Sequence, residues 1–348
     1  MYTLQNLDFG LTTRCNAACP QCPRTDNSIK KGYSWIKQEE ITLDDMKKIV
    51  PPSFFKKHNI FSVSFCGGYG DPLLAKDLFE ITEYLRGLVR PTATLSIATN
   101  GSMKKPIKWW HELGKILSKW NSCEVTFGLD GIDQDMHSKY RVHTNFLKIL
   151  ENAQILQMYG ISTRWQYIVF DYNEDFVEEA RALSKKYNFT TFHPLTAVRN
   201  PIDNDFRPPK DLTNLMTTRG ASYNNFTGNK FDYIDCISSK AREVHIPANG
   251  VVSPCCFLDE RYFIYRYKEE YIKLYGGADM TFQDIIASDN KTVEDIVTLW
   301  SDVDMGIFDS KERGLQAVLD EPWWESFFRK QKKLQVNKCN DACGKCSA

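Results

Sequence analysis

The sequence predicts an α/β fold built on a parallel sheet, and two observations carry this prediction. From residue 4 to about 195, short β-branched or apolar runs alternate with longer segments of helical period. Such alternation is typical of parallel strands joined by helical crossovers, in either a doubly wound sheet or a barrel. The length of 348 residues is the second observation, because it fits one large domain or a domain with an appended module.

Six strand–helix units are expected in this region, fewer than the eight of a closed barrel. The expected strands are Leu7–Leu11, Ile60–Phe65, Thr94–Ala98, Glu124–Leu129, Thr163–Phe170 and Thr191–His193. The expected helices lie near residues 42–50, 75–87, 106–119, 145–159 and 174–187.

The chain changes character after this region. Residues 199–235 contain prolines, several Asn and Gly residues and little periodicity, which predicts a connecting or lid loop. The Asn249-Gly250 pair then predicts a tight hairpin turn between Val244–Ile246 and Val251–Ser253. Residues 260–335 are expected to be mostly helical and aromatic, and a cysteine-containing tail follows. We therefore expect a smaller second unit behind the α/β region.

Composition excludes several classes of function. Forty-four Lys and Arg balance 44 Asp and Glu, so the chain lacks the long-range field expected of a protein that binds nucleic acid or anionic membranes. The 42% hydrophobic and 25% charged fractions are ordinary for a soluble globular protein. The N-terminal stretch lacks the basic start and apolar core of a signal peptide, and no long apolar run follows. We expect a cytoplasmic protein.

Cysteine is the unusual residue, with eleven in the chain. In a reducing compartment, C-x3-C and C-x2-C spacings indicate metal sites rather than disulfides. Cys15, Cys19 and Cys22 follow the first expected strand, and Pro20 and Pro23 oppose a helix there. A loop of this kind can fold three thiolates around one [4Fe–4S] cluster and leave the fourth iron without a protein ligand. A zinc site and buried thiols are the alternatives.

This C-x3-C-x2-C loop, placed at the end of a first strand and followed by α/β units, resembles the radical S-adenosylmethionine (SAM) superfamily. The resemblance implies a partial (β/α)6 TIM-like barrel. It also implies that SAM chelates the open iron of a [4Fe–4S] cluster, and that an electron from this cluster cleaves SAM to a 5′-deoxyadenosyl radical. The radical then abstracts a hydrogen atom from the substrate, and a reductant such as flavodoxin or ferredoxin supplies the electron.

Three further segments resemble the family's SAM-binding motifs, each at the end of an expected strand. The loop after the second strand is similar to the Gly-Gly-Glu-Pro motif that holds the SAM amino group, the third strand ends in a Thr-Asn-Gly segment, and the fourth ends in Leu-Asp-Gly with an arginine after it. Ligands bind at the carboxyl edge of parallel strands, so these segments share one rim. The resemblance implies these cofactor-binding candidates: Gly68, Tyr69, Gly70, Asp71, Thr99, Asn100, Asp130 and Arg141. His137 is expected to be structural, and no general acid or base is predicted.

The spacing from Cys236 through Gly250 to Cys255 follows the opening of SPASM/twitch auxiliary-cluster domains. With the tail cysteines, this implies a second [4Fe–4S] cluster in a small C-terminal α+β domain. The implied ligands are Cys236, Cys255, Cys343 and Cys346, with Cys256 and Cys339 as further possible ligands. A four-cysteine zinc site is an alternative, and the tail could itself supply three ligands of one cluster. Cys66 and Cys123 are expected to be core thiols.

The expected organisation is a radical SAM partial barrel in residues 1–198, a connecting or lid loop in 199–235 and a twitch/SPASM-like domain in 236–348. The leading hypothesis is a radical SAM enzyme that oxidises or otherwise modifies a small molecule or carbohydrate with help from the auxiliary cluster. A peptide-modifying maturase is the alternative. Many such relatives carry a recognition domain ahead of the barrel, for which Cys15 leaves no room. A non-catalytic iron–sulfur electron carrier is a third possibility.

Overall fold

The structure, a computed structural model, describes residues 3–196, 206–210, 233–234, 236–267, 303–330 and 344–345. Most of the expected connecting loop and the cysteines Cys339, Cys343 and Cys346 lie outside these residues. Within the described part of the chain, no helix is long and apolar enough to cross a membrane.

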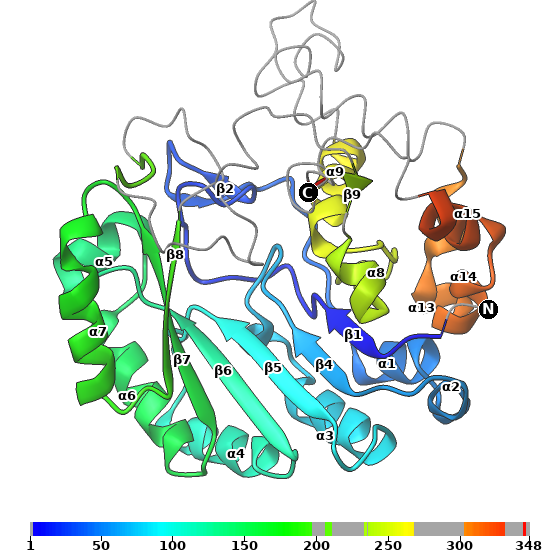
Figure 1. The fold of residues 1–348 in the computed structure, drawn as a ribbon, viewed down its shortest axis with the longest axis horizontal. Coiled ribbons are helices and arrows are strands. Elements are labelled where there is room, and N and C mark those ends of the chain that lie inside the picture. The colour runs from blue at the N-terminus through cyan, green and yellow to red at the C-terminus, as the bar shows by residue number, and fades with distance from the viewer. Residues whose placement is uncertain are drawn as a thin grey trace, which may run out of the picture.

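A seven-stranded sheet forms the centre of the molecule (Figure 1). Every neighbouring pair of strands is parallel, in the order β10-β1-β4-β5-β6-β7-β8, and the two outer strands do not pair with each other. The strands are β1 (Asn6–Phe9), β4 (Ser62–Phe65), β5 (Thr94–Thr99), β6 (Ser122–Gly128), β7 (Ser162–Val169), β8 (Thr191–Thr196) and β10 (Glu243–Ile246). The expected partial barrel is confirmed, with a seventh strand added at one edge.

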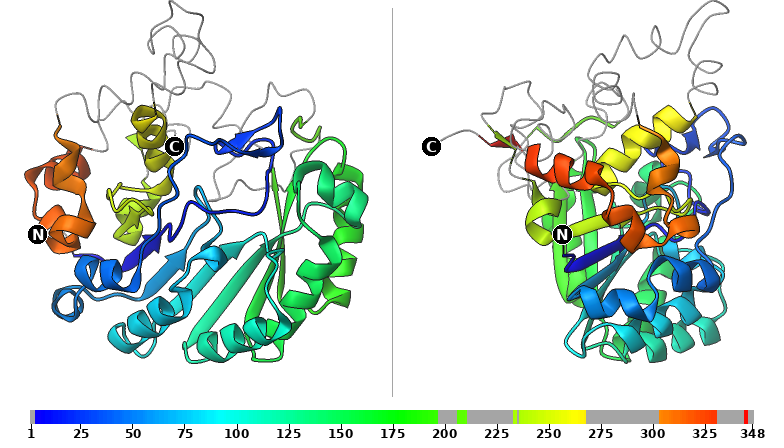
Figure 2. Two further views of the ribbon diagram at one scale, coloured as in Figure 1. Left: turned by 180° about the vertical axis from the view of Figure 1, so that it is seen from behind. Right: turned by 90° about the vertical axis from the view of Figure 1, so that its right-hand side faces the viewer.

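Helices cover one face of this sheet (Figures 1 and 2). They are α1 (Leu43–Ile49), α2 (Pro52–Lys57), α3 (Leu78–Leu88), α4 (Ile107–Leu117), α6 (Phe146–Gln157) and α7 (Val177–Lys186), and the shorter α5 (Gln134–Tyr140) precedes α6. All six expected strands and all five expected helices are present. The helices α2 and α5, the strand pair β2 (Thr25–Asp26) and β3 (Lys31–Gly32), and the pairing of β10 with β1 were not expected.

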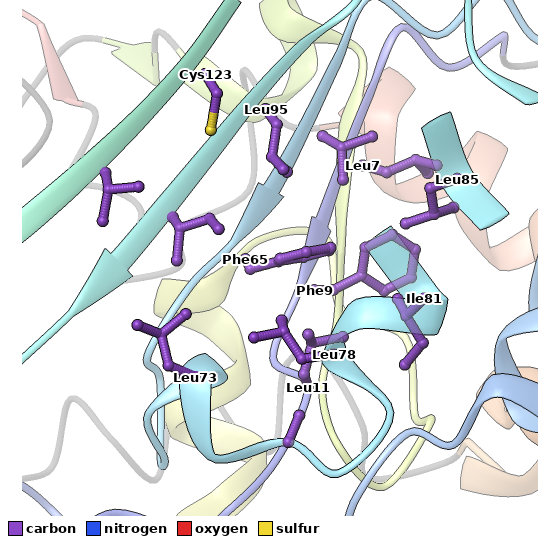
Figure 3. Packing of buried hydrophobic residues seen from close by; sticks show 14 of the residues in the cluster. Leu7, Phe9, Leu11, Phe65, Leu73, Leu78, Ile81, Leu85, Leu95 and Cys123 are labelled. Atoms are coloured by element: carbon purple, nitrogen blue, oxygen red, sulfur yellow. The ribbon is translucent and has the colours of Figure 1, made fainter. Parts of the chain in front are cut away.

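The main core lies between the sheet and these helices. Figure 3 shows Leu7 and Phe9 of β1 beside Phe65 of β4, facing Ile81 and Leu85 of α3. The rings of Phe9 and Phe65 meet edge to face with their centroids 6.5 Å apart. Because side chains alternate along a strand, the residue between Leu7 and Phe9 points to the opposite, concave face of the sheet. That face carries the polar residues described below.

The C-terminal residues complete this structure. Its elements are β9 (Tyr233–Ile234), α8 (Ile237–Ala241), β10, α9 (Cys256–Arg266), η5 (Met305–Phe308), α13 (Ser310–Arg313), α14 (Leu315–Leu319), α15 (Pro322–Lys330) and β11 (Gly344–Lys345). The expected hairpin turn is present: Gly250 has φ +84°, and the backbones of His245 and Ser253 exchange two hydrogen bonds of 2.9 Å. Figure 2 shows α8 and α9 on the side of the sheet away from α3 and α4.

Candidate functional site

The three-cysteine loop runs from Arg14 to Pro23, directly after β1, and it is irregular backbone as expected. Cys15, Cys19 and Cys22 are partly exposed. The amide of Ala17 donates to Cys15 Sγ over 3.4 Å, and the amide of Cys22 donates to the carbonyl of Cys19 over 3.0 Å. These local bonds fold the loop back on itself.

Burial and charge set the chemistry of these thiols. Burial, with Asp71 as a smaller cause, raises the pKa of Cys15 to about 12, and burial also raises the pKa of Cys19. One amide and one guanidinium group lie near the sulfurs. Asn100 Nδ2 is 3.7 Å from Cys15 Sγ, and Arg141 Nη1 is 3.9 Å from Cys19 Sγ. Thiolates bound to iron accept such N–H bonds. The donor set therefore fits an iron–sulfur cluster whose binding displaces the thiol protons.

Asp71 joins the glycine loop to the end of β5. Its buried carboxylate accepts hydrogen bonds from the Thr99 hydroxyl at 2.8 and 2.9 Å, from the Asn100 amide at 2.8 Å and from the Leu73 amide at 3.1 Å. The carboxylate is thus engaged within the protein. Asp71 and Thr99, both predicted at the cofactor site, act here by fixing the loops around it, and their direct contact with SAM stays a prediction.

Gly70 is a position where the sequence must have glycine. A Cβ atom there would lie 2.0 Å from the carbonyl oxygen of Thr12 and 2.8 Å from that of Arg14. This close approach lets the Asp71 amide donate to the Arg14 carbonyl over 2.7 Å. The glycine loop is therefore docked onto the backbone just before Cys15. A Cβ on Gly68, by contrast, would meet no atom within 4 Å, so this backbone faces open space.

Asn100 connects the end of β5 to the cysteine loop. Its Nδ2 donates to Asn16 Oδ1 over 2.9 Å, and its Oδ1 accepts from the Ser102 amide over 2.8 Å. Asn16 Nδ2 in turn donates to the Ser102 carbonyl over 3.3 Å. Asn16 was not among the predicted site residues, although its place between Cys15 and Cys19 was a usable signal. The structure brings the predicted Asn100 directly to the predicted cluster loop.

Asp130 and Arg141 form a buried ion pair at the end of β6. Arg141 Nε donates to Asp130 Oδ2 over 2.5 Å, and the Ile168 amide donates to Asp130 Oδ1 over 2.6 Å. Although burial alone would lower it, the Asp130 carboxylate raises the pKa of Arg141. A Cβ on Gly128 would lie 2.7–2.8 Å from the Arg141 guanidinium, so the glycine leaves room for it. Asp130 thereby positions a cation beside Cys19.

His137 has the structural role expected of it. Its Nδ1 accepts a hydrogen bond from the Asp130 amide over 3.3 Å, and its Nε2 lies 2.8 Å from the Thr144 hydroxyl. That hydroxyl donates onward to the Arg141 carbonyl over 2.5 Å, so Nε2 carries the proton and the ring is neutral. Burial, with Arg141 as a second cause, lowers the pKa of His137 to about 3.

A cluster of aromatic rings packs beside Cys19. Tyr140, Phe170, Tyr172 and Phe206 pack against one another with ring centroids 4.8–6.2 Å apart. The buried Tyr172 hydroxyl has no hydrogen-bond partner among the described residues, and the same is true of the Thr196 hydroxyl at the end of β8. Buried polar atoms are nearly always paired in proteins. Two unpaired hydroxyls near the rim therefore fit a polar cofactor or substrate.

A cleft opens beside the glycine loop. Its lining includes Gly10, Thr12, Gly68, Tyr69, Tyr262 and Arg266. The Arg266 guanidinium makes a two-bond ion pair with Glu39, at 2.6 and 2.7 Å, which holds α9 over the cleft. Tyr69 packs beside Ile36 and Tyr267 and so closes one wall. The predicted cofactor residues Gly68 and Tyr69 thus face a cavity that reaches towards β10.

The second cysteine set is described only in part. Cys236 lies at the N-terminus of α8, where its sulfur accepts from the Ser239 amide over 3.4 Å. Cys255 and Cys256, at the start of α9, are partly exposed. The strand β11 pairs antiparallel with β9, with Gly344 opposite Ile234. The predicted ligands Cys343 and Cys346, and the further possible ligand Cys339, lie outside the described residues.

The two cysteines expected in the core differ. Cys123 of β6 is buried among the residues between sheet and helices, as Figure 3 shows. Cys66 follows β4 and is partly exposed, and its sulfur lies 3.8 Å from His245 Nδ1. The expectation of an apolar core thiol was wrong for Cys66, because the strand end turns it to the polar concave face.

The structure is that of an α/β protein with a parallel partial barrel and a three-thiol loop at its carboxyl rim. The model of the radical SAM superfamily matches residues 10–183, which is half of the chain. The chain therefore belongs to the radical SAM superfamily. Members are enzymes that use SAM, and membership implies one [4Fe–4S] cluster and SAM as cofactors. No curated protein sequence matches the chain.

Solved structures share the fold at low sequence identity. SuiB of Streptococcus suis bound to S-adenosylmethionine is 14% identical with a TM-score of 0.53, covering 74% of this chain and 61% of its own. SuiB bound to its precursor peptide SuiA gives a TM-score of 0.50. The protein anSMEcpe with bound AdoMet is 18% identical with a TM-score of 0.51, covering 97% of this chain and 95% of its own. The chain thus spans about three fifths of SuiB.

Proposed function

We propose that this protein reductively cleaves SAM and uses the resulting 5′-deoxyadenosyl radical to remove a hydrogen atom from a small molecule or carbohydrate. The observation that carries the proposal is the docking of the cysteine loop onto the carboxyl rim. Asp71 contacts the Arg14 backbone, Asn100 contacts Cys15 and Asn16, and Arg141 contacts Cys19. A [4Fe–4S] cluster bound there would supply the electron for SAM cleavage.

The chain's own residues have three tasks in this proposal. Gly68 offers bare backbone to the amino acid part of SAM, because no side chain or neighbouring atom blocks it. Arg141 holds a fixed positive charge next to Cys19, which stabilises an anionic cluster or the SAM carboxylate. The rings of Tyr140, Phe170 and Tyr172 keep water from this side of the cluster, and the Tyr172 hydroxyl, which has no partner among the described residues, is available to a polar SAM atom.

An anaerobic assay tests the proposal. Reconstituted protein with dithionite and SAM should form 5′-deoxyadenosine, measured by mass spectrometry, and the Cys15→Ala variant should form none above background. Cys123→Ala is the matched control, because Cys123 is a buried thiol in the core and its loss should leave the product unchanged. Equal product from the Cys15→Ala variant would refute the proposal, and a non-catalytic electron carrier would form no product with the unmodified protein.

We also propose that Cys236, Cys255, Cys343 and Cys346 hold an auxiliary [4Fe–4S] cluster that accepts an electron or positions the substrate. The support is topological. Gly344 and Lys345, which stand between two of these cysteines in the sequence, pair with Tyr233 and Ile234, just before Cys236. Two clusters require about eight irons per chain, and the Cys236→Ala variant should retain about four. About four irons together with all-sulfur zinc in the unmodified protein would contradict this second cluster.

A peptide substrate is the alternative, supported by the shared fold of SuiB, which was solved with its precursor peptide SuiA. Deuterium transfer separates the two. Extract from cells grown in deuterated medium is divided into a low-molecular-weight filtrate and a peptide-sized fraction, and each is given to the reconstituted protein. Deuterium in 5′-deoxyadenosine from the filtrate supports a small molecule. Deuterium only from the peptide fraction, abolished by protease treatment, supports the maturase.

A further inference from the structure

Three potential metal ligands meet on the concave face of the sheet, away from the cysteine loop. They come from three neighbouring strands: Asp8 from β1, Cys66 from the end of β4 and His245 from β10. The pairing of β1 with β10 places Asp8 directly opposite His245. One ligand atom from each residue lies within 4.8 Å of the other two.

The distances between these atoms suit a tetrahedral metal. His245 Nδ1 lies 2.9 Å from Asp8 Oδ2 and 3.8 Å from Cys66 Sγ. Ligand atoms around a tetrahedral zinc ion stand roughly 3.3–3.6 Å apart, given the usual zinc–nitrogen, zinc–oxygen and zinc–sulfur bond lengths. Shifts of a few tenths of an ångström would bring these two distances from the imidazole nitrogen into that range, and the carboxylate oxygen and the sulfur already lie within 4.8 Å of each other.

A second layer of groups holds two of these residues in place. His245 Nε2, the ring nitrogen turned away from the other two ligands, lies 3.5 Å from Asp259 Oδ2. The Ser64 hydroxyl donates to Asp8 Oδ1, and Oδ2 is the oxygen beside His245 Nδ1. Carboxylates on the remote nitrogen of a ligating histidine, and hydrogen bonds to the free oxygen of a ligating carboxylate, are the usual supports of metal sites. Asp8, His245 and Asp259 are all nearly fully buried.

We propose that Asp8, Cys66 and His245 bind a zinc ion, separate from the iron–sulfur clusters, with a water molecule as the fourth ligand. One sulfur, one nitrogen and one carboxylate oxygen form a donor set that zinc accepts, and three protein ligands with one open position are typical of non-structural zinc sites. His245 and Asp259 line the cleft beside Gly68 and Tyr69, which gives the ion a route in. This site does not depend on the proposed SAM chemistry.

Metal analysis of the anaerobically purified full chain with its clusters tests the site. We expect about one zinc per chain, and a zinc-edge X-ray absorption spectrum with one sulfur and three nitrogen or oxygen neighbours. This spectrum separates the site from a four-cysteine zinc site, whose shell is all sulfur. Absence of zinc after growth and purification with zinc present, or an all-sulfur shell, would overturn the proposal.

Variants tie the zinc to these residues. Cys66→Ala should lose the zinc and keep the iron content, whereas Cys123→Ala should keep both, since Cys123 lies in the apolar core. Asp259→Asn keeps the shape of the side chain and all three ligands. This variant therefore tests the zinc site even if Cys66→Ala fails to fold. Loss of a second-layer partner typically weakens metal binding about 10–100-fold, and we expect a chelator to remove zinc from this variant correspondingly more easily. Unchanged zinc in Cys66→Ala would refute the assignment.

Discussion

Single residues at the rim act mainly on one another before any cofactor binds. The Asp71 carboxylate accepts hydrogen bonds from the Thr99 hydroxyl and from the backbone amide of Asn100. The side-chain amide of Asn100 in turn donates to Asn16 of the cysteine loop. The loops that carry the predicted SAM contacts are thus connected by short polar bonds in a buried setting, where such bonds are strong. The site's geometry therefore depends on residues that need never touch SAM.

Local patterns and distant contacts differ in what a sequence can reveal. The candidate ligands Cys15, Cys19 and Cys22 could be proposed from the sequence because their spacing is contained in eight residues. Asn16 and Asn100 are 84 residues apart, and Asp8 and His245 are 237 apart, so no local pattern reports either contact. Cys66 was misinterpreted for the same reason, since its partner His245 is supplied by a strand from the other end of the chain.

Gly128 gives a prediction at this scale. In Gly128→Ala, the new Cβ would overlap the Arg141 guanidinium, which is flexible enough to move and would leave Asp130 and Cys19. The fold should persist, while SAM binding weakens on the order of tenfold, or about 1.4 kcal/mol. Equilibrium binding of SAM and the electron paramagnetic resonance spectrum of the reduced cluster measure the change.

Gly87→Ala is the control for this variant. Gly87 lies exposed in α3, and an added Cβ would meet no atom within 4 Å. Alanine is favoured over glycine in a helix by about 0.5–1 kcal/mol, so this variant should be slightly more stable and bind SAM normally. If both variants bound SAM as the unmodified protein does, Arg141 would not need its present position.

At the scale of elements, the sequence predicted the main strands and helices of the barrel and missed two short helices. The helix α1 was predicted from its pattern, and a capping box that was not predicted begins it: the Thr42 hydroxyl accepts from the Asp45 amide over 3.1 Å, and the Asp45 carboxylate accepts from the Thr42 amide over 3.0 Å. The six-residue helix α2 is too short for a helical period to repeat. The helix α5 has seven residues, as many as α1, and was missed although the Asp133 carboxylate caps it by accepting from the Met136 amide over 2.8 Å. The strand β10 was predicted within a hairpin, but its place beside β1 depends on a non-local pairing.

The helix α5 makes stability depend on pH through His137. The folded-state pKa of about 3 lies below the unfolded value near 6.5, so the unfolded chain binds the proton first as the pH falls. Above pH 6.5, His137 is neutral in both states and does not change the free energy of unfolding. As the pH falls from 6.5 to 3, protonation of His137 in the unfolded chain lowers the free energy of unfolding. From pH 7.5 to 5.5 this loss should be roughly 1–1.5 kcal/mol.

The His137→Gln variant tests this linkage. A glutamine can still accept from the Asp130 amide and donate to Thr144, but it does not titrate. The variant should be less stable than the unmodified protein at pH 7.5, because the imidazole packing is lost, and its stability should fall less on acidification. Denaturant midpoints at the two pH values, recorded without oxygen, give the comparison. An equal fall in both proteins would assign the pH dependence to other groups.

At the scale of the whole molecule, the two ends of the chain build one core. Residues 303–330 contribute Phe308, Leu315 and Trp324 to the same buried cluster as Met46 of α1 and Leu4 before β1. Polar contacts join the same parts: Gln316 of α14 lies 2.9 Å from His58 Nε2, and the Lys311 ammonium donates to the Glu40 carbonyl over 2.7 Å. The C-terminal helices therefore support the strand that leads into the cysteine loop.

This shared core predicts that a cavity in the C-terminal helices destabilises the barrel. Phe308 is buried against Trp323 and Trp324, with ring centroids 4.9 and 5.9 Å away, and its carbonyl accepts from the Val252 amide over 2.9 Å. Phe308→Ala should lower the free energy of unfolding by about 3–5 kcal/mol. Phe176→Ala, which removes a partly exposed ring, should lower it far less. Melting is followed by far-ultraviolet circular dichroism and by the visible absorbance of the cluster proposed for the Cys15–Cys22 loop. Because one core must unfold as a unit, both signals should shift downward together in Phe308→Ala. A cluster signal that keeps its original midpoint while the helical signal shifts would show instead that the barrel is stable without the C-terminal helices.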